Sequence, residues 1–73
     1  MIEPMNVHQA IRRSKCGVAE RWNRRSKRIE YAKKTVSGIR IVRSVTDPTV
    51  VRQLSPAQEL TLGWTPYSPK AVR

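Results

Sequence analysis

The arrangement of charge limits the fold of this chain more than any other feature. From Arg12 to Lys34 there are ten basic residues and two acidic ones, a net charge of +8, whereas residues 46–73 carry a net charge of only +1. Between Arg24 and Arg28, four of five residues are cations, which repel one another along a helix. The sequence therefore predicts a basic segment followed by a nearly neutral segment. Within the basic segment, a helix that runs through residues 24–28 is disfavoured.

The length of 73 residues allows one small domain. Phe is absent and only four residues are aromatic, two Trp and two Tyr, so the core is expected to consist mainly of Val, Ile and Leu. A two-domain enzyme, a dinucleotide-binding fold and a barrel are excluded by this length. No apolar run approaches the roughly 18 residues of a membrane span, and the first residues do not have the pattern of a secretion signal.

The first element is predicted as a short helix over about residues 7–16. Asn6 is a candidate N-cap, Gln9 completes a capping box, and Gly17 is a suitable C-terminal stop. Because about ten residues cannot form a stable isolated helix, Ile11 and its apolar neighbours must pack on another element.

The next stretch supports two interpretations. Trp22, Ile29 and Val36 recur at intervals of seven, which favours a second helix at about 18–34. Downstream, however, a hairpin signal centred on residues 37 and 38 and alternating apolar residues favour an antiparallel meander of strands at about 29–36, 39–45 and 49–54. The meander is preferred. Placing Val45 opposite Val50 would bring Arg43 opposite Arg52, an unfavourable pairing that indicates either a shifted register or an anion-binding surface.

After Leu54 the composition changes. Ser55 and Pro56 begin a helical turn, Gly63 ends it, and residues 63–73 are Pro-rich and are expected to form a flexible tail. The predicted class is therefore α+β, with a short N-terminal helix, a small antiparallel β-hairpin or meander and a flexible C-terminal tail; the alternative is a mostly α fold. Residues 1–54 would form the basic domain and residues 55–73 the helical turn and tail.

Catalytic and metal sites lack the necessary residues. His8 and Cys16 are the only His and Cys, and on one helix they would lie eight residues apart, about 12 Å along the axis. One Cys and one His cannot supply four zinc ligands, and the five carboxylates are spread along the chain. The sequence thus predicts a protein that is not an enzyme and has no cofactor or metal. The single Cys suits a reducing compartment.

The positive charge predicts a polyanionic partner, and the excess of Arg over Lys favours specific contacts. One reading is a nucleic-acid binder, either an RNA binder or a helix-turn-helix protein in which arginines line a groove and Asn23 reads bases. The other is an adaptor that docks on an acidic surface of a larger assembly. A third possibility, a small ribosomal protein, fits less well because Lys and Gly are few. Trp22 is more readily explained as a core residue than as a stacking platform.

Residues Met5 to Trp22 (MNVHQAIRRSKCGVAERW) and the total length resemble the family of small transcription regulators of lytic Xanthomonas bacteriophages. The resemblance covers the whole chain. It implies a protein of the host bacterial cytoplasm that binds the N-terminal region of the RNA polymerase β′ subunit near the RNA exit channel. It further implies that the protein inhibits initiation by interfering with σ factor and, with the factor NusA, acts as an antiterminator.

The two lines of reasoning lead to one set of candidate residues. The hydrophobic dock is expected at Val7, Ile11 and Trp22. The basic patch is expected at Arg12, Arg13, Lys15, Arg21, Arg24, Arg25, Lys27 and Arg28. Such a patch would serve both an acidic polymerase surface and nascent RNA or DNA. The protein is expected to be a monomer that does not bind membranes.

Overall fold

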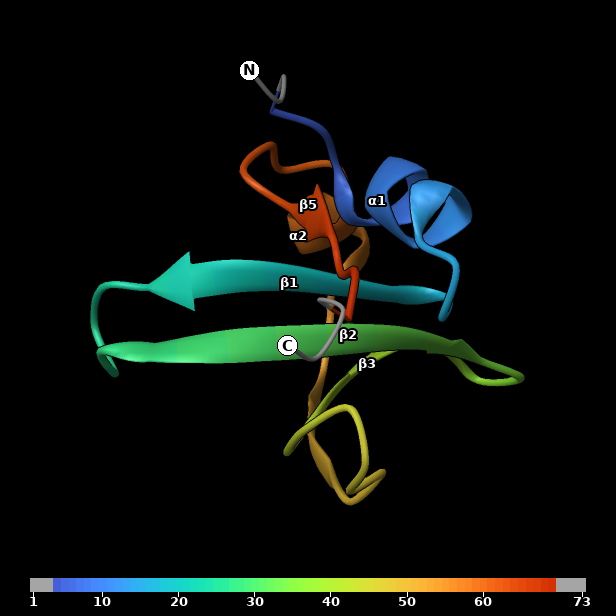
Figure 1. Ribbon diagram of the computed structural model, residues 1–73. Helices are drawn as coiled ribbons and strands as arrows, with labels where there is room; N and C mark the ends of the chain where they lie inside the picture. Colours follow the sequence, from blue (N-terminus) through green and yellow to red (C-terminus); the bar gives the residue numbers. More distant parts are fainter. Residues whose placement is uncertain (1–3, 70–73) are drawn as a thin grey trace.

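The computed structural model describes residues 4–69, which form two short helices and an antiparallel sheet (Figure 1). The elements in chain order are α1 (Val7–Arg13), β1 (Val18–Asn23), β2 (Arg28–Thr35), β3 (Gly38–Val42), β4 (Val50–Gln53), α2 (Pro56–Glu59) and β5 (Thr65–Pro66). The five strands lie in the order β4-β3-β2-β1-β5, and every neighbouring pair is antiparallel. This arrangement confirms the α+β class. Neither helix within residues 4–69 is long and apolar enough to cross a membrane.

Helix α1 begins where the sequence predicts and ends early. The Asn6 side chain accepts a hydrogen bond from the Gln9 N–H at 2.9 Å, and the Gln9 side chain accepts one from the Asn6 N–H at 3.0 Å, which completes the capping box. Ser14 is extended, and its hydroxyl donates to the carbonyl of Tyr67 at 2.6 Å. The predicted end near residue 16 is therefore wrong, because a contact with a distant segment takes Ser14 out of the helix.

The predicted alternative of a second helix at 18–34 is also wrong. Strands β1 and β2 pair from Val18 opposite Lys33 to Asn23 opposite Arg28. The Asn23 side chain accepts the N–H groups of the two residues that follow Arg24, and Lys27 has a positive φ of 57°. Asn stabilises turns through such local hydrogen bonds. The chain therefore reverses within the cation-rich stretch where a helix would have placed like charges side by side.

The predicted meander is confirmed, with small shifts. The strands expected at 29–36, 39–45 and 49–54 correspond to β2, β3 and β4. The two-residue turn lies at residues 36 and 37, one position earlier than expected, because Thr35 pairs with Gly38. The register of the β3–β4 pair places Arg52 opposite Ile41, and a bulge follows between Ile41 and Val42. The register is therefore shifted from the one expected, and this shift removes the unfavourable Arg43–Arg52 pairing.

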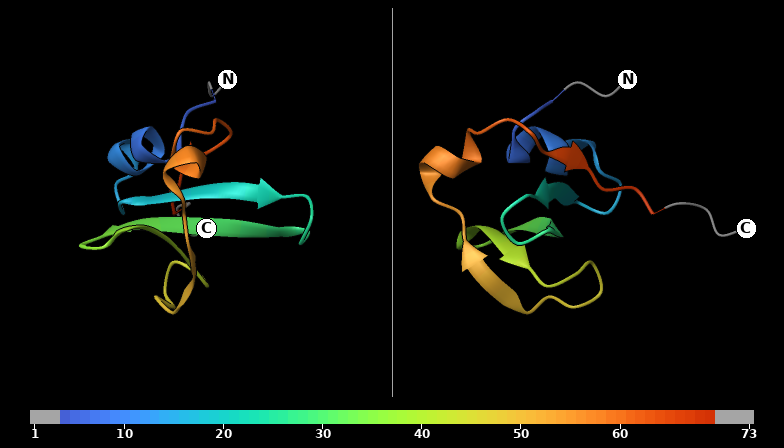
Figure 2. Two further views of the ribbon diagram at one scale, coloured as in Figure 1. Left: turned by 180° about the vertical axis from the view of Figure 1, so that it is seen from behind. Right: turned by 90° about the vertical axis from the view of Figure 1, so that its left-hand side faces the viewer.

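The core lies between α1 and one face of a curved sheet (Figure 2). Trp64 is its largest fully buried side chain, and the backbone N–H of Trp64 donates to the carbonyl of Met5 at 3.0 Å. Strand β5 then pairs with β1 at Ala19 and Glu20. The prediction of a flexible tail is therefore wrong for residues 64–67, because these contacts and a hydrogen bond from the backbone N–H of Tyr67 to the carbonyl of Val18 hold them on β1. Residues 70–73 of the predicted tail lie outside the described residues.

Candidate polyanion-binding surfaces

The predicted basic patch is divided between the two ends of strand β1. One group lies in the last turn of α1 and in the loop before β1, and the other extends from the middle of β1 to the turn at its end (Figure 1). The six residues of β1 span about 20 Å. We call the first group the α1 cluster: Arg12, Arg13 and Lys15. We call the second the hairpin-tip cluster: Arg21, Arg24, Arg25, Lys27 and Arg28.

The predicted hydrophobic dock is not one surface. Val7 is completely buried in the core, so it has no surface that a partner could touch. Ile11 is half-buried and packs against the core, whereas Trp22 is 58% exposed on the hairpin. Trp22 is thus not a core residue, contrary to the sequence interpretation, and it lies at the far end of β1 from Ile11.

Arg12 is the one member of the α1 cluster that lines a small hollow. This hollow has a volume of about 240 Å³ and is lined by His8, Ile11, Arg12, Lys34 and Ile39. The His8 Nε2 atom lies 2.7 Å from a carboxylate oxygen of Glu59, which ties α1 to α2. Arg12 and Arg13 lie in the last turn of α1, where the helix dipole favours positive charge. These two exposed cations can therefore stabilise the helix and remain free to bind an anion.

A larger cleft lies beside the hairpin-tip cluster. Its volume is about 510 Å³. Four arginines line it together with a tryptophan and two amide side chains: Arg21, Arg24, Arg25, Arg52, Trp22, Asn23 and Gln58. Guanidinium groups bind phosphate and carboxylate oxygens in pairs. The cleft therefore has the chemistry of a site for an extended anion.

Glu30 holds two of these arginines in place. An Arg21 guanidinium nitrogen lies 2.8 Å from its carboxylate, and an Arg52 nitrogen lies 2.9 Å from it. Burial alone would raise the pKa of Glu30, but the hydrogen bonds from Arg21, Arg52 and Asn23 outweigh burial and lower the pKa below its usual value. Arg21 also lies over the Trp64 ring, 4.4 Å from its centroid. Two rigid arginines therefore form the base of the cleft.

The remaining cations of the hairpin-tip cluster differ from this pair. Arg24, Arg25, Lys27 and Arg28 are exposed, and within residues 4–69 no carboxylate lies within 4 Å of their charged atoms. Their charge is not neutralised by the protein itself. It is therefore available to a ligand.

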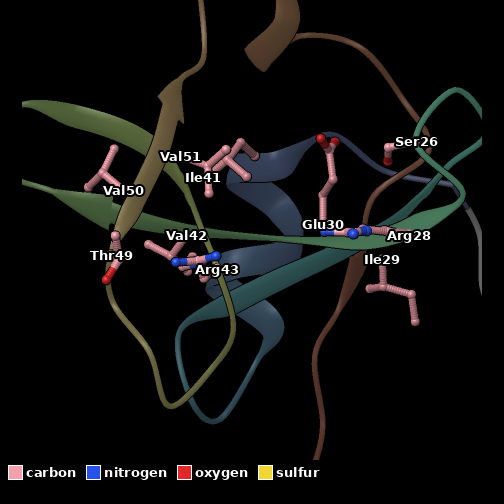
Figure 3. A pocket seen from close by; sticks show the side chains of 10 residues that line it. All are labelled: Ser26, Arg28, Ile29, Glu30, Ile41, Val42, Arg43, Thr49, Val50 and Val51. Atoms are coloured by element: carbon pink, nitrogen blue, oxygen red, sulfur yellow. The ribbon is translucent and has the colours of Figure 1, made fainter.

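A third cleft, of about 440 Å³, lies between strands β2 and β4 (Figure 3). It forms because β3 ends at Val42, so that β2 has no neighbour on that side beyond Tyr31. Glu30 and Ile29 point to opposite sides of β2 in Figure 3. The cleft is thus a gap at a strand edge with mixed lining. Within the described part of the chain, no group of three His, Cys, Asp or Glu residues could hold a metal ion.

The sequence reasoning missed Glu30 and Arg52 as parts of the site. They lie 22 residues apart on β2 and β4, which are not neighbours in the sheet, and the Arg52 side chain reaches the Glu30 carboxylate across β3. The one available signal was the conflict between Arg43 and Arg52, which indicated either a shifted register or an anion-binding surface, and the register is shifted.

Comparisons with protein-family models, curated proteins and solved structures find no match for this chain. Its function is therefore inferred from the geometry of the two clusters and from the resemblance noted for residues 5–22.

Proposed function

We propose that this chain is a non-enzymatic phage transcription regulator that binds bacterial RNA polymerase. The expected contact is the N-terminal region of the β′ subunit near the RNA exit channel. There the protein would inhibit initiation by interfering with σ factor and would act as an antiterminator together with NusA. This function comes from the resemblance of residues 5–22 and of the total length to small phage regulators.

The single observation that best supports it is the α1 cluster. Arg12, Arg13 and Lys15 are exposed beside the half-buried Ile11, on a helix that is clamped to the core. An apolar patch with a basic rim suits an acidic protein surface, because the apolar part slows dissociation and the charges accelerate association. Of the predicted dock, Ile11 is therefore the residue that we assign to this contact. Val7 is completely buried and has no surface for a partner.

The helix-turn-helix version of the nucleic-acid alternative is overturned by the fold. The segment that would supply the recognition helix is the β1–β2 hairpin. Helix α1 has seven residues, and its buried side chains face the sheet.

The test is retention of purified, nuclease-treated RNA polymerase on immobilised protein at about 0.15 M and then about 0.5 M salt, where exposed charge contacts are screened. The wild-type protein should retain the polymerase through both washes. The triple variant Arg12→Gln, Arg13→Gln, Lys15→Gln should capture less polymerase at about 0.15 M salt, because it lacks the charges that accelerate association, while the complex that it does form should survive the wash at about 0.5 M through Ile11. The matched control is Arg24→Gln, Arg25→Gln, Lys27→Gln, which removes the same charge from the hairpin tip only.

Retention should be accompanied by a lower rate of initiation in the presence of σ factor. Failure of the wild-type protein to retain the polymerase at 0.15 M salt would refute the proposal. Equal losses in the two sets of variants would show that the binding is unspecific attraction and that the α1 cluster has no special role.

A further inference from the structure

We propose that the tip of the β1–β2 hairpin binds single-stranded nucleic acid, with its arginines on the phosphates and an unpaired base stacked on Trp22. The site is distinct from the α1 cluster. Nucleic-acid binding at this site is an activity additional to polymerase binding. A test of one does not decide the other.

The hairpin projects beyond the rest of the sheet. Strand β5 pairs with β1 only at Ala19 and Glu20, and β3 pairs with β2 no further than Tyr31. Residues 21–30 therefore pair only with each other, and the hairpin extends past its neighbours in Figures 1 and 2. A ligand can reach this end of the hairpin from both faces and along both edges.

Trp22 offers an exposed aromatic ring at this tip. It is 58% exposed and lies directly opposite Ile29, which is 46% exposed. The other Trp residue, Trp64, is fully buried and serves the core. Bases stack on exposed aromatic rings whatever their sequence, because every base has a π face. Trp22, supported by Ile29 on the next strand, has the features of such a platform.

The arginines of the tip can follow a phosphate backbone around the turn, because Arg21 and Glu30 lie on the face of the hairpin opposite Trp22 and Ile29. Arg21 and Arg52 are held by Glu30, so they lose little side-chain entropy when they bind a phosphate. Arg24 and Arg25 are exposed and unpaired within the described residues, and they line the same cleft of about 510 Å³. The rigid pair can fix one phosphate, while the exposed pair adapts to the next.

A single strand fits this surface better than a duplex or an acidic protein. In a duplex the faces of the bases are covered by stacking, so that no base could lie on Trp22. An acidic protein would satisfy the arginines but would leave the ring of Trp22 without a specific role. Single-stranded RNA and DNA share the required chemistry, and the experiment distinguishes them.

The experiment is binding of a dye-labelled oligomer of about six nucleotides, within the size range of single-strand sites. Oligouridine RNA, oligothymidine DNA and a duplex of the same length are compared by fluorescence anisotropy between about 0.05 and 0.2 M salt. We expect a single strand to bind more tightly than the duplex. Trp22→Ala should weaken single-strand binding by roughly 5- to 150-fold, as stacking residues do.

The charge variants separate specific from general attraction. Removing two phosphate contacts with Arg24→Gln, Arg25→Gln should reduce the slope of log K against log salt by about 1.4. Arg12→Gln, Arg13→Gln removes the same charge at the α1 cluster and should leave that slope almost unchanged. Thermal unfolding of each variant verifies that the fold is retained. If Trp22→Ala does not fold, the salt dependence of the Arg24→Gln, Arg25→Gln variant still tests the site, because both side chains are exposed.

Three results would each overturn the proposal. They are equal effects of the two double variants, a folded Trp22→Ala protein with wild-type affinity, and tighter binding of the duplex. Polymerase retention by the hairpin-tip variant is measured separately, so failure of this site and failure of the proposed function are distinguishable. Preference for oligouridine would identify RNA as the ligand, and preference for oligothymidine would identify DNA.

Discussion

Replacing Glu30 by Gln preserves the shape of the side chain and removes the charge that holds Arg21 and Arg52. The Glu30 side chain is only 13% exposed, and the arginine side chains are 23% and 35% exposed. Hydrogen bonds to charged groups contribute roughly 1.5–3 kcal/mol each when they are shielded from water. Because the arginines are partly exposed and screened by solvent, about 1 kcal/mol for each is appropriate here.

We therefore expect Glu30→Gln to lower the free energy of unfolding by about 2 kcal/mol, the sum of two partly screened contacts of this kind. For a domain of this size, this corresponds to a fall in Tm of roughly 8–16 °C. The assay is thermal unfolding followed by circular dichroism at neutral pH. The matched control is Glu20→Gln on β1, for which we expect a change within about 0.5 kcal/mol, since residues 4–69 contain no ion pair to Glu20.

The pH dependence provides a second test of the same contact. The pKa of Glu30 is lower in the folded protein than its ordinary value of 4.5. Its stabilising contribution is then fully present above that value and is lost as the pH falls through the lower, folded pKa. The difference in stability between wild type and Glu30→Gln should be constant near neutral pH and should shrink below pH 4.5. Equal small effects of Glu30→Gln and Glu20→Gln, or a difference that persists in strong acid, would refute the reasoning.

Two further substitutions test the fold itself. Trp64→Ala removes the largest buried side chain and should cost about 3–5 kcal/mol, comparable to the whole stability of a small domain, so that its amide NMR spectrum should lose its dispersion; a dispersed spectrum with an unchanged free energy of unfolding would show that Trp64 is not part of the core. Asn6→Ala removes the side-chain cap of α1 and should lower the free energy of unfolding by about 1 kcal/mol in urea titration, and no change would contradict the capping box.

The elements that the sequence predicted correctly depend on short-range signals. The start of α1 follows from a hydrogen-bond pair between Asn6 and Gln9, which are three residues apart. The start of α2 follows from the same kind of pair between Ser55 and Gln58. Strands β2, β3 and β4 follow from alternating residues and tight turns between near neighbours. In each case the decisive interactions lie within a few residues, where a single sequence contains them.

The failures depend on contacts between distant segments. Ser14 leaves the helix because its hydroxyl meets the carbonyl of Tyr67, 53 residues away. Trp64 is buried because its backbone meets Met5 and because α1 covers it, and neither partner is visible in a Pro-rich stretch. The spacing of seven between Trp22 and Ile29 resembled a helix face, but the same spacing places them opposite each other across a hairpin whose turn is stabilised by Asn23.

The candidate site was predicted only in its composition. The sequence indicated which cations would bind a polyanion, but it placed Arg12 and Arg24 in one patch, whereas the hairpin separates them by the length of β1. The partner of Arg21 and Arg52 was invisible because Glu30 meets them from another strand. The sequence thus identified the cations of the candidate site. The pairing of the strands determines which of them lie together in each cluster.

The exchange of roles between the two tryptophans connects the fold to the hairpin tip. Trp64 fills the core, so Trp22 is not needed there and can remain exposed at the end of β1. Arg21 lies over the ring of Trp64 and also binds Glu30, so its position is determined by the core from one side and by the ion pair from the other. Arg21 at the base of the cleft is therefore held from two sides, while the exposed arginines at the turn have no ion pair within the described residues. A surface with a fixed base and an adaptable rim suits a flexible polyanion, because it fixes one point of contact and lets the rest of the chain adjust.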